Sequence, residues 1–412
     1  MPNKNAPLQG INVLDFTVYQ NGPSATQILS DYGANVIKIE PLRGEPLRYL
    51  SPKNRPNVGF EIFNRGKKSI AIDLKNPDGL DIIKKLLLHT DILCENFRSG
   101  VMNRLGLGYE EVSRINPKIL YCANRGLGSK GDWSTRPSFD YVAQGYTGVM
   151  HGAGGGPSHP PIPIEWAFSD EVGAMNFYNA ILTALFNRTR TGTGEHIITS
   201  QAAATLQFQR GAITSAALNG GKQRDDGMRP GWGMAQANQI LKASDGKYLV
   251  VALGSSDQWR RYAKLVLLRD DLLTDDRTKT GMARLRNKEF VLDTIGKVII
   301  EKPRDYWINK CIEHNVPCAP VQNYEEVSND KFLRENNYIV DVIHRDHGKM
   351  TVVGPTTTFS NSKLGEVAAQ APYIGEHTRD ILKEYIGMND TEITRLKNKG
   401  VIGTGEDKRS RM

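Results

Sequence analysis

Cysteine is scarce in this sequence. The chain has 412 residues and four cysteines, which are Cys94, Cys122, Cys311 and Cys318. So few thiols in so long a chain disfavour a disulfide framework, and free thiols are expected. Cys311 and Cys318 flank His314, but no fourth ligand lies nearby, and this short segment is typical of a helix end that enters a strand. A zinc site is therefore disfavoured, and no metal is predicted.

Long apolar runs are also lacking. Hydrophobic residues make up 39% of the chain, which is enough for a sizeable interior. No apolar run approaches the roughly 20 residues that span a bilayer. Residues 1–5 contain no apolar segment of the kind found in a signal peptide. We therefore expect a cytoplasmic protein without a membrane partner.

Clusters of like charge are missing as well. Lysine and arginine (53) outnumber aspartate and glutamate (45), for a formal net charge of +8, but the charges are spread along the chain. The only basic run, at 408–411, is interpreted as a solvated end. Because no motif combines basic and aromatic residues, nucleic acid is disfavoured as a partner. A small ligand that carries phosphate fits the positive charge better.

Common nucleotide-binding and catalytic motifs have no clear match. Walker A, G-x-S-x-G and H-E-x-x-H are absent, so phosphotransferase, hydrolase and zincin functions lose their usual support. Residues 126–131 match G-x-G-x-x-G, but a dinucleotide-binding loop opens directly into a helix, and residues 132–137 do not start one. We interpret these glycines as a turn. The glycine-rich segment 152–157 is interpreted as a surface loop or a loop that covers an active site, too flexible for the interior of a helix or strand.

Strand and helix patterns alternate over the first half of the chain. Strands are predicted at 10–16, 34–39, 69–74, 91–95, 119–123 and 196–199, and helices at 24–32, 77–89 and 170–188. Strands separated by helices need crossover connections. The pattern therefore predicts an α/β fold with a parallel sheet that is covered on both faces.

The length of the chain favours two domains. Residues 1–200 are predicted to form most of a large domain, 201–230 a linker, and 231–325 a smaller α+β domain. This smaller domain opens with a hairpin around 244–246 and contains helices at 259–267 and 289–300. Residues 326–412 are predicted to form a linker and a return to the large domain, with a helix at 378–385.

Asp170 has the strongest local argument for a function. It lies where a proline-rich segment meets the predicted long helix. Taken alone it is a helix N-cap, because an aspartate there accepts hydrogen bonds from free amides and contributes about 1 kcal/mol. Gly173 and Ala174 favour a functional role, because they remove side-chain bulk beside the carboxylate, which a ligand needs and a cap does not.

Several blocks of sequence then resemble one family in order and spacing. They are 8–16 with Gln20, Gly22 and Pro23, then 33–40, 67–70 with 73–75, 95–98 with 104–106, 169–174 and 375–378. The block SDEVGA at 169–174 is similar to the D-x-x-G-[AG] motif of class III CoA-transferases, the CaiB/BaiF type. Over essentially its whole length the chain is identified as a member of that family.

The N-terminal part is most similar to the formyl-CoA/oxalate branch of the family. This resemblance implies that Gln20 lies near the acyl group. It also implies a set of residues that hold CoA, composed of Ile72, Asp73, Lys75, Asn96 and Arg104. Arg104 suits a phosphate because its planar donor fork binds pairs of oxygen atoms.

The chain departs from this branch at several positions. The branch has histidine, arginine and lysine where this chain has Val18, Pro41 and Pro137, and its glycine-rich flap is only loosely matched at 227–232. These positions surround the acyl pocket and CoA in the branch. The resemblance therefore does not carry over oxalate specificity.

The resemblance also implies an architecture and a set of partners. The family fold is a Rossmann-like large domain built from both chain ends, plus a smaller domain, and two subunits thread through each other as an interlocked homodimer. Some members pair instead with a paralogous subunit. CoA thioesters and carboxylic acids are substrates in this family, and no cofactor is bound permanently.

The implied mechanism uses Asp170 as a nucleophile. An aspartate with an ordinary pKa of ~3.9 is ionised at neutral pH and needs no base, and a helix N-terminus favours its charge by roughly 0.3–1 kcal/mol. We expect an acyl-aspartyl anhydride, then an aspartyl-CoA thioester from which an acceptor acid takes CoA. Succinyl-CoA is one candidate donor.

Two other functions stay open at this point. A 2-methylacyl-CoA racemase of the same family needs an acid–base pair, commonly a histidine before an aspartate. The matching place holds Phe139 and Asp140, and Phe139 cannot exchange a proton. Asp140 either lines the site or is a solvated or helix-capping aspartate. The second alternative is a non-catalytic CoA-binding subunit of a hetero-oligomer, against which the intact Asp170 argues.

Overall fold

The computed structural model describes residues 6–50, 57–223 and 239–405. The basic run at 408–411, the first five residues and the predicted flap at 227–232 lie outside the described residues. The described chain divides into two compact units. The first contains the described parts of Met1–Met150, Ile162–Lys222 and Glu335–Met412, and the second contains those of His151–Pro161 and Gln223–Arg334.

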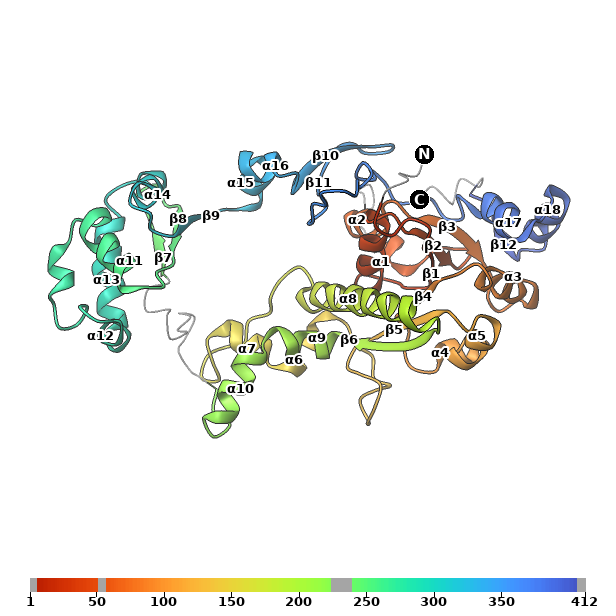
Figure 1. Ribbon diagram of the computed structural model, residues 1–412, viewed down its shortest axis with the longest axis horizontal. Coiled ribbons are helices and arrows are strands. Elements are labelled where there is room, and N and C mark those ends of the chain that lie inside the picture. The colour runs from red at the N-terminus through yellow and green to blue at the C-terminus, as the bar shows by residue number, and fades with distance from the viewer. Residues whose placement is uncertain (1–5, 51–56, 224–238, 406–412) are drawn as a thin grey trace. The chain divides into compact units, whose positions relative to one another are not determined.

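A seven-stranded sheet forms the centre of the first unit (Figure 1). Its order is β12 (Ile402–Gly403), β3 (Lys68–Ile72), β2 (Asn35–Glu40), β1 (Asn12–Asp15), β4 (Ile92–Glu95), β5 (Leu120–Arg125) and β6 (Glu195–Ser200). All neighbouring strands are parallel except β12, which pairs antiparallel with β3. The predicted α/β fold with a mainly parallel sheet is therefore confirmed.

Helices surround this sheet. They are α1 (Asn21–Asp31), α2 (Val58–Asn64), α3 (Pro77–Leu87), α4 (Val101–Arg104), α5 (Tyr109–Ile115), α6 (Asp140–Thr147), α8 (Phe168–Thr191), α9 (Gln201–Phe208), α10 (Arg210–Leu218), α17 (Thr378–Ile386) and α18 (Asp390–Asn398), with a 3-10 turn at Pro46–Tyr49. A hairpin of β10 (Ile339–His344) and β11 (Gly348–Val353) completes the unit. Throughout the described residues, every helix is too short or too polar to cross a membrane.

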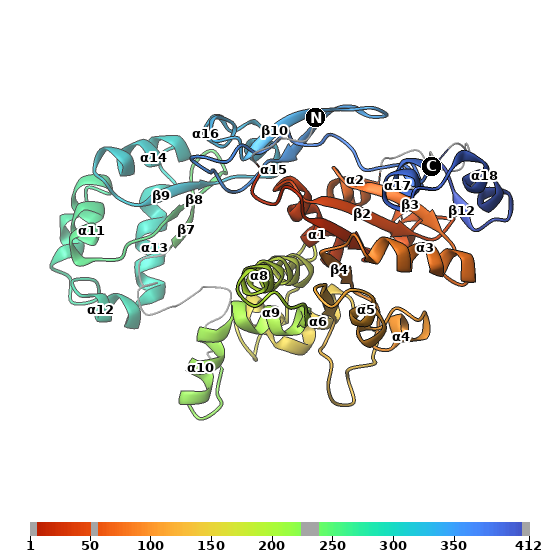
Figure 2. The same cartoon turned by 45° about the vertical axis from the view of Figure 1, so that its right-hand side comes forward.

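Side chains that alternate along the strands build a core on each face of the sheet. Leu14 of β1 packs in one core with Ile83 of α3 and Ile381 of α17. Its neighbour Val13 packs in the opposite core with Phe177 of α8. Figures 1 and 2 show the C-terminal helices α17 and α18 beside α3 and β12 at the edge of the sheet. Because both faces are buried, the strands are nearly continuous apolar runs, which made them visible in the sequence.

The second unit has its own small sheet and core. Its antiparallel strands are β7 (Gln239–Lys242), β8 (Tyr248–Val251) and β9 (Cys318–Val321), and its helices include α11 (Ser256–Arg261), α12 (Gly281–Arg286), α13 (Lys288–Ile299), α14 (Arg304–Glu313) and α15 (Tyr324–Asn329). A 3-10 turn lies at Asp270–Leu273. Trp259, Tyr262 and Ile295 lie in its core. Two short helices, α7 (Val149–Gly154) and α16 (Lys331–Glu335), cross the boundaries between the units.

Several local predictions differ from the structure. The long helix begins at Phe168, not at Asp170. The helix predicted at 259–267 is α11 followed by one π-helical turn at Tyr262–Val266. The segment 152–157 was predicted to be too flexible for the interior of a helix. This was wrong for residues 152–154, which belong to α7. Most of the segment predicted as a linker forms α9 and α10 within the first unit, and residues 224–230 lie outside the described residues.

Buried charges fix the loop that follows β1. Asp15 and Lys67 form a fully buried ion pair of 2.9 Å. Lys38 and Glu45 form a second one of the same length, and Lys38 Nζ also donates to the Thr17 carbonyl oxygen. Burial alone would raise the pKa of Asp15, but Lys67 and Lys38 outweigh it and hold that pKa below its ordinary value. Asp15 is therefore charged, and it depends on Lys67 as its buried partner.

We predict that Asp15→Ala destabilises the first unit by about 3–5 kcal/mol, because it leaves Lys67 buried without its counter-charge. The matched control is Asp81→Ala, which removes an exposed ion pair with Lys85 on α3 and is expected to cost at most about 1 kcal/mol. Urea unfolding measures the change, with hydrogen exchange of the β1–β3 peptides as the local readout. Equal shifts in the two variants would contradict the prediction.

Candidate active site

A cavity of about 260 Å³ lies at the carboxyl ends of β1, β4 and β5. Ligands bind at this edge in open α/β sheets. The lining residues are Val18, Tyr19, Gln20, Asn21, Asn96, Phe97, Arg98, Asn124, Arg125, Gly126, Leu127, Ser134, Arg136, Pro137, Ser138, Phe139, Asp170 and Gln201. All of them belong to the first unit. Three of the predicted site residues, Gln20, Asn96 and Asp170, therefore meet in one cavity.

Asp170 lies in the first turn of α8, two residues inside the helix. The N-cap position is occupied by Ala167, so the interpretation of Asp170 as an N-cap was wrong. Ala167 and Trp166 both have a positive φ, 57° and 60°, in the left-handed region that non-glycine residues rarely adopt. These two left-handed residues turn the chain sharply just before α8. The turn places Asp170, in the first turn of the helix, at the cavity.

Asp140 caps α8 from another helix. Its Oδ1 accepts hydrogen bonds from the backbone amides of Ser169 (2.6 Å) and Asp170 (3.1 Å). Its Oδ2 accepts a 2.6 Å hydrogen bond from Gln144 Nε2. Asp140 is buried and does not line the cavity. Of the alternatives for Asp140, the helix-capping one describes its contacts, although the helix that it caps lies 30 residues further along the chain.

The environment of Asp170 raises its pKa to about 7. Burial is the main cause, and the like charges of Asp140 and Glu171 add to it, while the Gln201 amide, which donates to Oδ1, opposes it. The sequence had suggested an ordinary aspartate that is fully ionised at neutral pH. That expectation was wrong, because burial and the neighbouring negative charges disfavour the charged carboxylate.

Gly173 has a different role from the one inferred. A Cβ atom at this position would lie 2.3 Å from Nδ2 of Asn21, so glycine makes room for a protein side chain and not for a ligand. Ala174 is fully buried in the core between α8 and the sheet. The two small residues therefore let α8 approach α1 closely, and this approach places Asn21 against the turn that carries Asp170.

Two other predicted site residues that line the cavity, Gln20 near the acyl group and Asn96 for CoA, are held by hydrogen bonds. Gln20 Nε2 donates to Glu171 Oε1 at 2.7 Å, so the side chain next to Asp170 fixes Gln20. Asn96 Oδ1 accepts from the Val18 amide (2.9 Å), and Asn96 Nδ2 donates to the Val18 carbonyl oxygen (2.8 Å). Both residues line the cavity, and Asn96 ties the ends of β1 and β4 together.

The remaining residues predicted to hold CoA lie outside the cavity. Ile72 is buried at the end of β3. Asp73 Oδ1 accepts a 3.0 Å hydrogen bond from the Lys75 amide in the turn before α3. Arg104 ends α4 with an exposed side chain. The structure therefore does not bring these four residues to Asp170.

Three arginines that sequence reasoning missed line the cavity. Arg125 is paired with Glu95 through two hydrogen bonds of 2.6 and 2.8 Å. Arg98 and Arg136 have no carboxylate partner among the residues that the structure describes. The Arg136 guanidinium lies 3.9 Å above the ring of Trp133. In the sequence, Arg98 and Arg125 lie shortly after predicted strands, and Arg136 lies beside Pro137. These positions were the only indication that the arginines could lie at the site.

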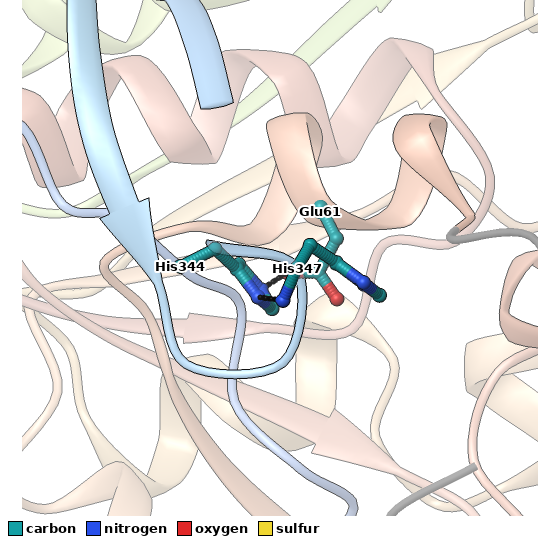
Figure 3. A group of neighbouring side chains, drawn as sticks. All are labelled: Glu61, His344 and His347. Atoms are coloured by element: carbon teal, nitrogen blue, oxygen red, sulfur yellow. Dashed lines mark hydrogen bonds and ion pairs between the residues drawn. The ribbon is translucent and has the colours of Figure 1, made fainter. Parts of the chain in front are cut away.

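A cluster of metal-ligating side chains lies elsewhere in the first unit (Figure 3). Glu61 belongs to α2, His344 is the last residue of β10, and His347 lies in the turn between β10 and β11. His344 Nε2 lies 2.9 Å from Glu61 Oε2, while His344 Nδ1 accepts hydrogen bonds from the amides of Asp346 (3.0 Å) and His347 (3.2 Å). A metal-bound histidine usually donates its second ring N–H, and here Nδ1 faces two donors. We interpret the cluster as a clasp in which His344 Nε2–H donates to Glu61.

Comparisons with known proteins agree with this geometry. Residues 8–378 match the family described as CoA-transferase family III. Succinyl-CoA:glutarate CoA-transferase of Homo sapiens is 33% identical over 98% of this chain and 92% of its own length. Formyl-CoA:oxalate CoA-transferase of Rhodopseudomonas palustris is 28% identical over 96% of this chain and 97% of its own. The crystal structure of a CaiB/BaiF family protein from Brucella suis has a TM-score of 0.81 at 28% identity, covering 93% of this chain and 100% of that one.

The fold and these matches define a CoA-transferase, an enzyme of acyl-CoA metabolism. The chain belongs to CoA-transferase family III, the CaiB/BaiF type. The predicted family is thereby confirmed, and so is the class of enzyme. Enzymes of this class use CoA thioesters as substrates.

From the nucleophilic role that the resemblance implies for Asp170, we predict that kcat/KM rises with pH to a plateau, with a midpoint near the Asp170 pKa of about 7, because a carboxylate nucleophile reacts in its charged form. In Asp140→Asn the amide oxygen still caps α8, but the like charge is gone. The pKa of Asp170 should fall, so the midpoint should move to lower pH.

A pH–rate profile of both proteins measures this shift. The matched control is Asp132→Asn, which changes an exposed aspartate of the same unit outside the cavity lining. Its midpoint should equal that of the parent enzyme. An unchanged midpoint in Asp140→Asn would show that Asp140 does not act on Asp170.

Proposed function

We propose that this enzyme moves CoA between an acyl-CoA and a free carboxylic acid through covalent intermediates on Asp170. The observation that carries the proposal is that Asp170 is the only carboxyl group lining the cavity within the described ranges. A Ser or Cys nucleophile needs a neighbouring base, and the same described lining contains no histidine. A carboxylate needs none once it is charged.

The proposed reaction proceeds by exchange at two carbonyl carbons. An Asp170 oxygen attacks the thioester carbonyl, the C–S bond breaks, and CoA leaves as a thiolate while the mixed acyl-aspartyl anhydride forms. The thiolate then attacks Cγ of Asp170 and releases the first acid as a carboxylate, which leaves an aspartyl-CoA thioester. The acceptor carboxylate reverses these steps and departs as the new acyl-CoA. Because acylation removes the negative charge of Asp170, the burial that raises its pKa also favours the neutral intermediates.

The racemase alternative finds no support at this cavity. Phe139 lines it at the position where a proton carrier would be required, and its ring makes an edge contact with Tyr19, with centroids 5.4 Å apart. Asp140, next in the chain, is engaged in capping α8. The non-catalytic alternative would leave unexplained why Asp170 faces the cavity with a perturbed pKa.

We also propose where the substrates and partners bind. Gln20 and Asn96 shape the acyl end of the site, and Ile72, Asp73, Lys75 and Arg104 hold the nucleotide end of CoA outside the cavity. Asp140 acts on Asp170 and not on a ligand. From the resemblance we propose an interlocked homodimer, with a paralogous partner subunit as the alternative. From the sequence we propose the domain boundaries given above and a cytoplasmic location.

We propose further that the acyl group carries a second carboxylate. Arg98 and Arg136 line the cavity without a carboxylate partner in the described chain, and the stack of Arg136 on Trp133 leaves the edge of its guanidinium available. The names of two relatives, succinyl-CoA:glutarate and formyl-CoA:oxalate CoA-transferase, contain dicarboxylic acids. A dicarboxylate acceptor would place one carboxylate at Asp170 and the other at these arginines.

We expect Asp170→Ala to reduce transfer from succinyl-CoA by at least roughly 1,000-fold while CoA still binds, because the nucleophile is lost. In the parent enzyme, mass spectrometry after incubation with succinyl-CoA should find the peptide containing Asp170 heavier by the acyl group or CoA. The control Asp132→Ala should keep both turnover and adduct. Turnover without Asp170 would refute the mechanism.

We expect Arg136→Gln to lower kcat/KM for glutarate by about 10–100-fold, the loss of one charge-assisted hydrogen bond, and to leave the monocarboxylic acid of equal chain length nearly unchanged. The matched control is Arg104→Gln outside the cavity, which should weaken acyl-CoA binding and slow both acids equally. Steady-state kinetics of each variant with glutarate and with the monocarboxylic acid measures these changes in kcat/KM. Equal losses for both acids in Arg136→Gln would assign Arg136 to CoA instead.

A further inference from the structure

Three buried side-chain amides line the same cavity as Asp170, and each has one atom without a hydrogen-bond partner in the chain as described. These atoms are Asn21 Nδ2, Asn124 Oδ1 and Gln201 Oε1. All three residues line the cavity, and their exposed fractions are only 5%, 3% and 6%. Buried polar atoms are normally paired. Three such atoms around one carboxylate indicate that their partners belong to a ligand or to a reaction intermediate.

The orientation of the Asn21 amide is fixed by a hydrogen bond from Asn124. Asn21 is the first residue of α1, and its Oδ1 accepts a hydrogen bond from Asn124 Nδ2 at the end of β5. This contact leaves Nδ2, which carries two protons, on the side of α8. Nδ2 lies directly against Gly173, one helical turn after Asp170, where a Cβ would be 2.3 Å away. The Asn21 amide is also close enough to favour the charged form of Asp170 and lower its pKa.

We propose that Asn21 is a further catalytic residue, whose Nδ2–H stabilises the negative charge that develops on the carbonyl oxygen of acylated Asp170. Asn124 is a positioning residue that acts through Asn21. The proposal rests on the proposed function, because it requires Asp170 to become acylated. It adds a donor that the predicted mechanism did not contain.

The chemical step requires such a donor. When the CoA thiolate or an acceptor carboxylate attacks Cγ of acylated Asp170, a bond forms to Cγ and the C=O π electrons move onto the Asp170 oxygen. Collapse of this tetrahedral species restores C=O and expels the other group as a carboxylate or a thiolate. A donor held in place next to that oxygen stabilises the tetrahedral species without reorganisation, as in an oxyanion hole. Gln201, which already donates to Asp170 Oδ1, approaches from α9 and Asn21 from α1.

A purely structural role explains the arrangement less well. A structural asparagine would have both ends of its amide paired, whereas Asn21 Nδ2 and Asn124 Oδ1 are both unpaired. The chain also keeps a glycine at 173 so that Nδ2 can approach α8. These features converge on one unused donor beside the reactive carboxylate.

The first test is Asn21→Ala, assayed with succinyl-CoA and glutarate. Turnover should fall by roughly 100-fold, and the aspartyl-CoA thioester on Asp170 should form and decay more slowly, because both steps are attacks at Cγ that lose a donor. The midpoint of kcat/KM against pH should move to higher pH, because a group that favours the charged carboxylate is lost. Asn187→Ala, an exposed asparagine on α8, is the matched control and should change neither property.

The second test uses Asn124→Ala and the double variant. Asn124→Ala should show a smaller loss and a pH shift in the same direction, because Asn21 is present but no longer held. If Asn124 acts only through Asn21, the double variant should be no slower than Asn21→Ala. Additive losses would overturn the positioning role. If Asn21→Ala does not fold, judged by urea unfolding and CoA binding, the pH midpoint of Asn124→Ala decides alone.

The outcomes separate this proposal from the proposed function. Absence of an adduct on Asp170 in the parent enzyme would refute the nucleophile and, with it, the role of Asn21. An aspartyl-CoA thioester that forms at the same rate, with the same pH midpoint of kcat/KM, in the parent enzyme and in Asn21→Ala would refute the role of Asn21 alone.

Discussion

The site depends on an electrostatic conflict at the start of α8. A helix N-terminus normally favours a carboxylate, but here the amides of Ser169 and Asp170 are already bound by Asp140. The Asp170 carboxylate therefore experiences burial and a second negative charge, which raise its pKa to about 7. In the proposed reaction this conflict disappears each time Asp170 is acylated. Burial and the charge of Asp140 destabilise the resting, charged carboxylate. They therefore lower the energy of the neutral covalent intermediates relative to that charged state.

The loop after β1, which lines the cavity beside Asp170, is held in place by buried hydrogen bonds and ion pairs. The loop after β1 is tied by Lys38 to the Thr17 carbonyl oxygen and by Glu45 to the amide of Tyr19, a residue held at a φ of 65°. Asn96 fixes the neighbouring Val18. Since Gln20 and Asn21 follow directly, the buried ion pairs below the loop determine where both amides stand relative to Asp170. Stability and catalysis are therefore linked through the same few charges.

The sequence predicted the sheet well because its strands are buried on both faces and alternate with amphipathic helices. It also placed Asp170, Gln20 and Asn96, which lie at strand or helix ends and belong to family motifs. It could not show that Asp140 caps a helix 30 residues away, or that Gly173 accommodates Asn21, because both facts depend on contacts between distant segments. The raised pKa of Asp170 follows mainly from its burial and then from the charge of Asp140, and both depend on packing that the sequence does not show. Arg98, although inside the family block at 95–98, and Arg136 received no predicted role, because their positions in the sequence do not show that they line the cavity.

The pairing of β12 with β3 has a consequence for how the protein is made. Ile402 pairs with Ile72, so the edge of β3 is covered by residues that leave the ribosome more than three hundred positions later. At translation rates of roughly 5–20 residues per second, that edge stays open for about 20–60 s. An open strand edge can pair with other nascent chains. Biosynthesis of this enzyme therefore includes an interval in which the strand that leads into the proposed CoA-binding turn is exposed and in need of protection.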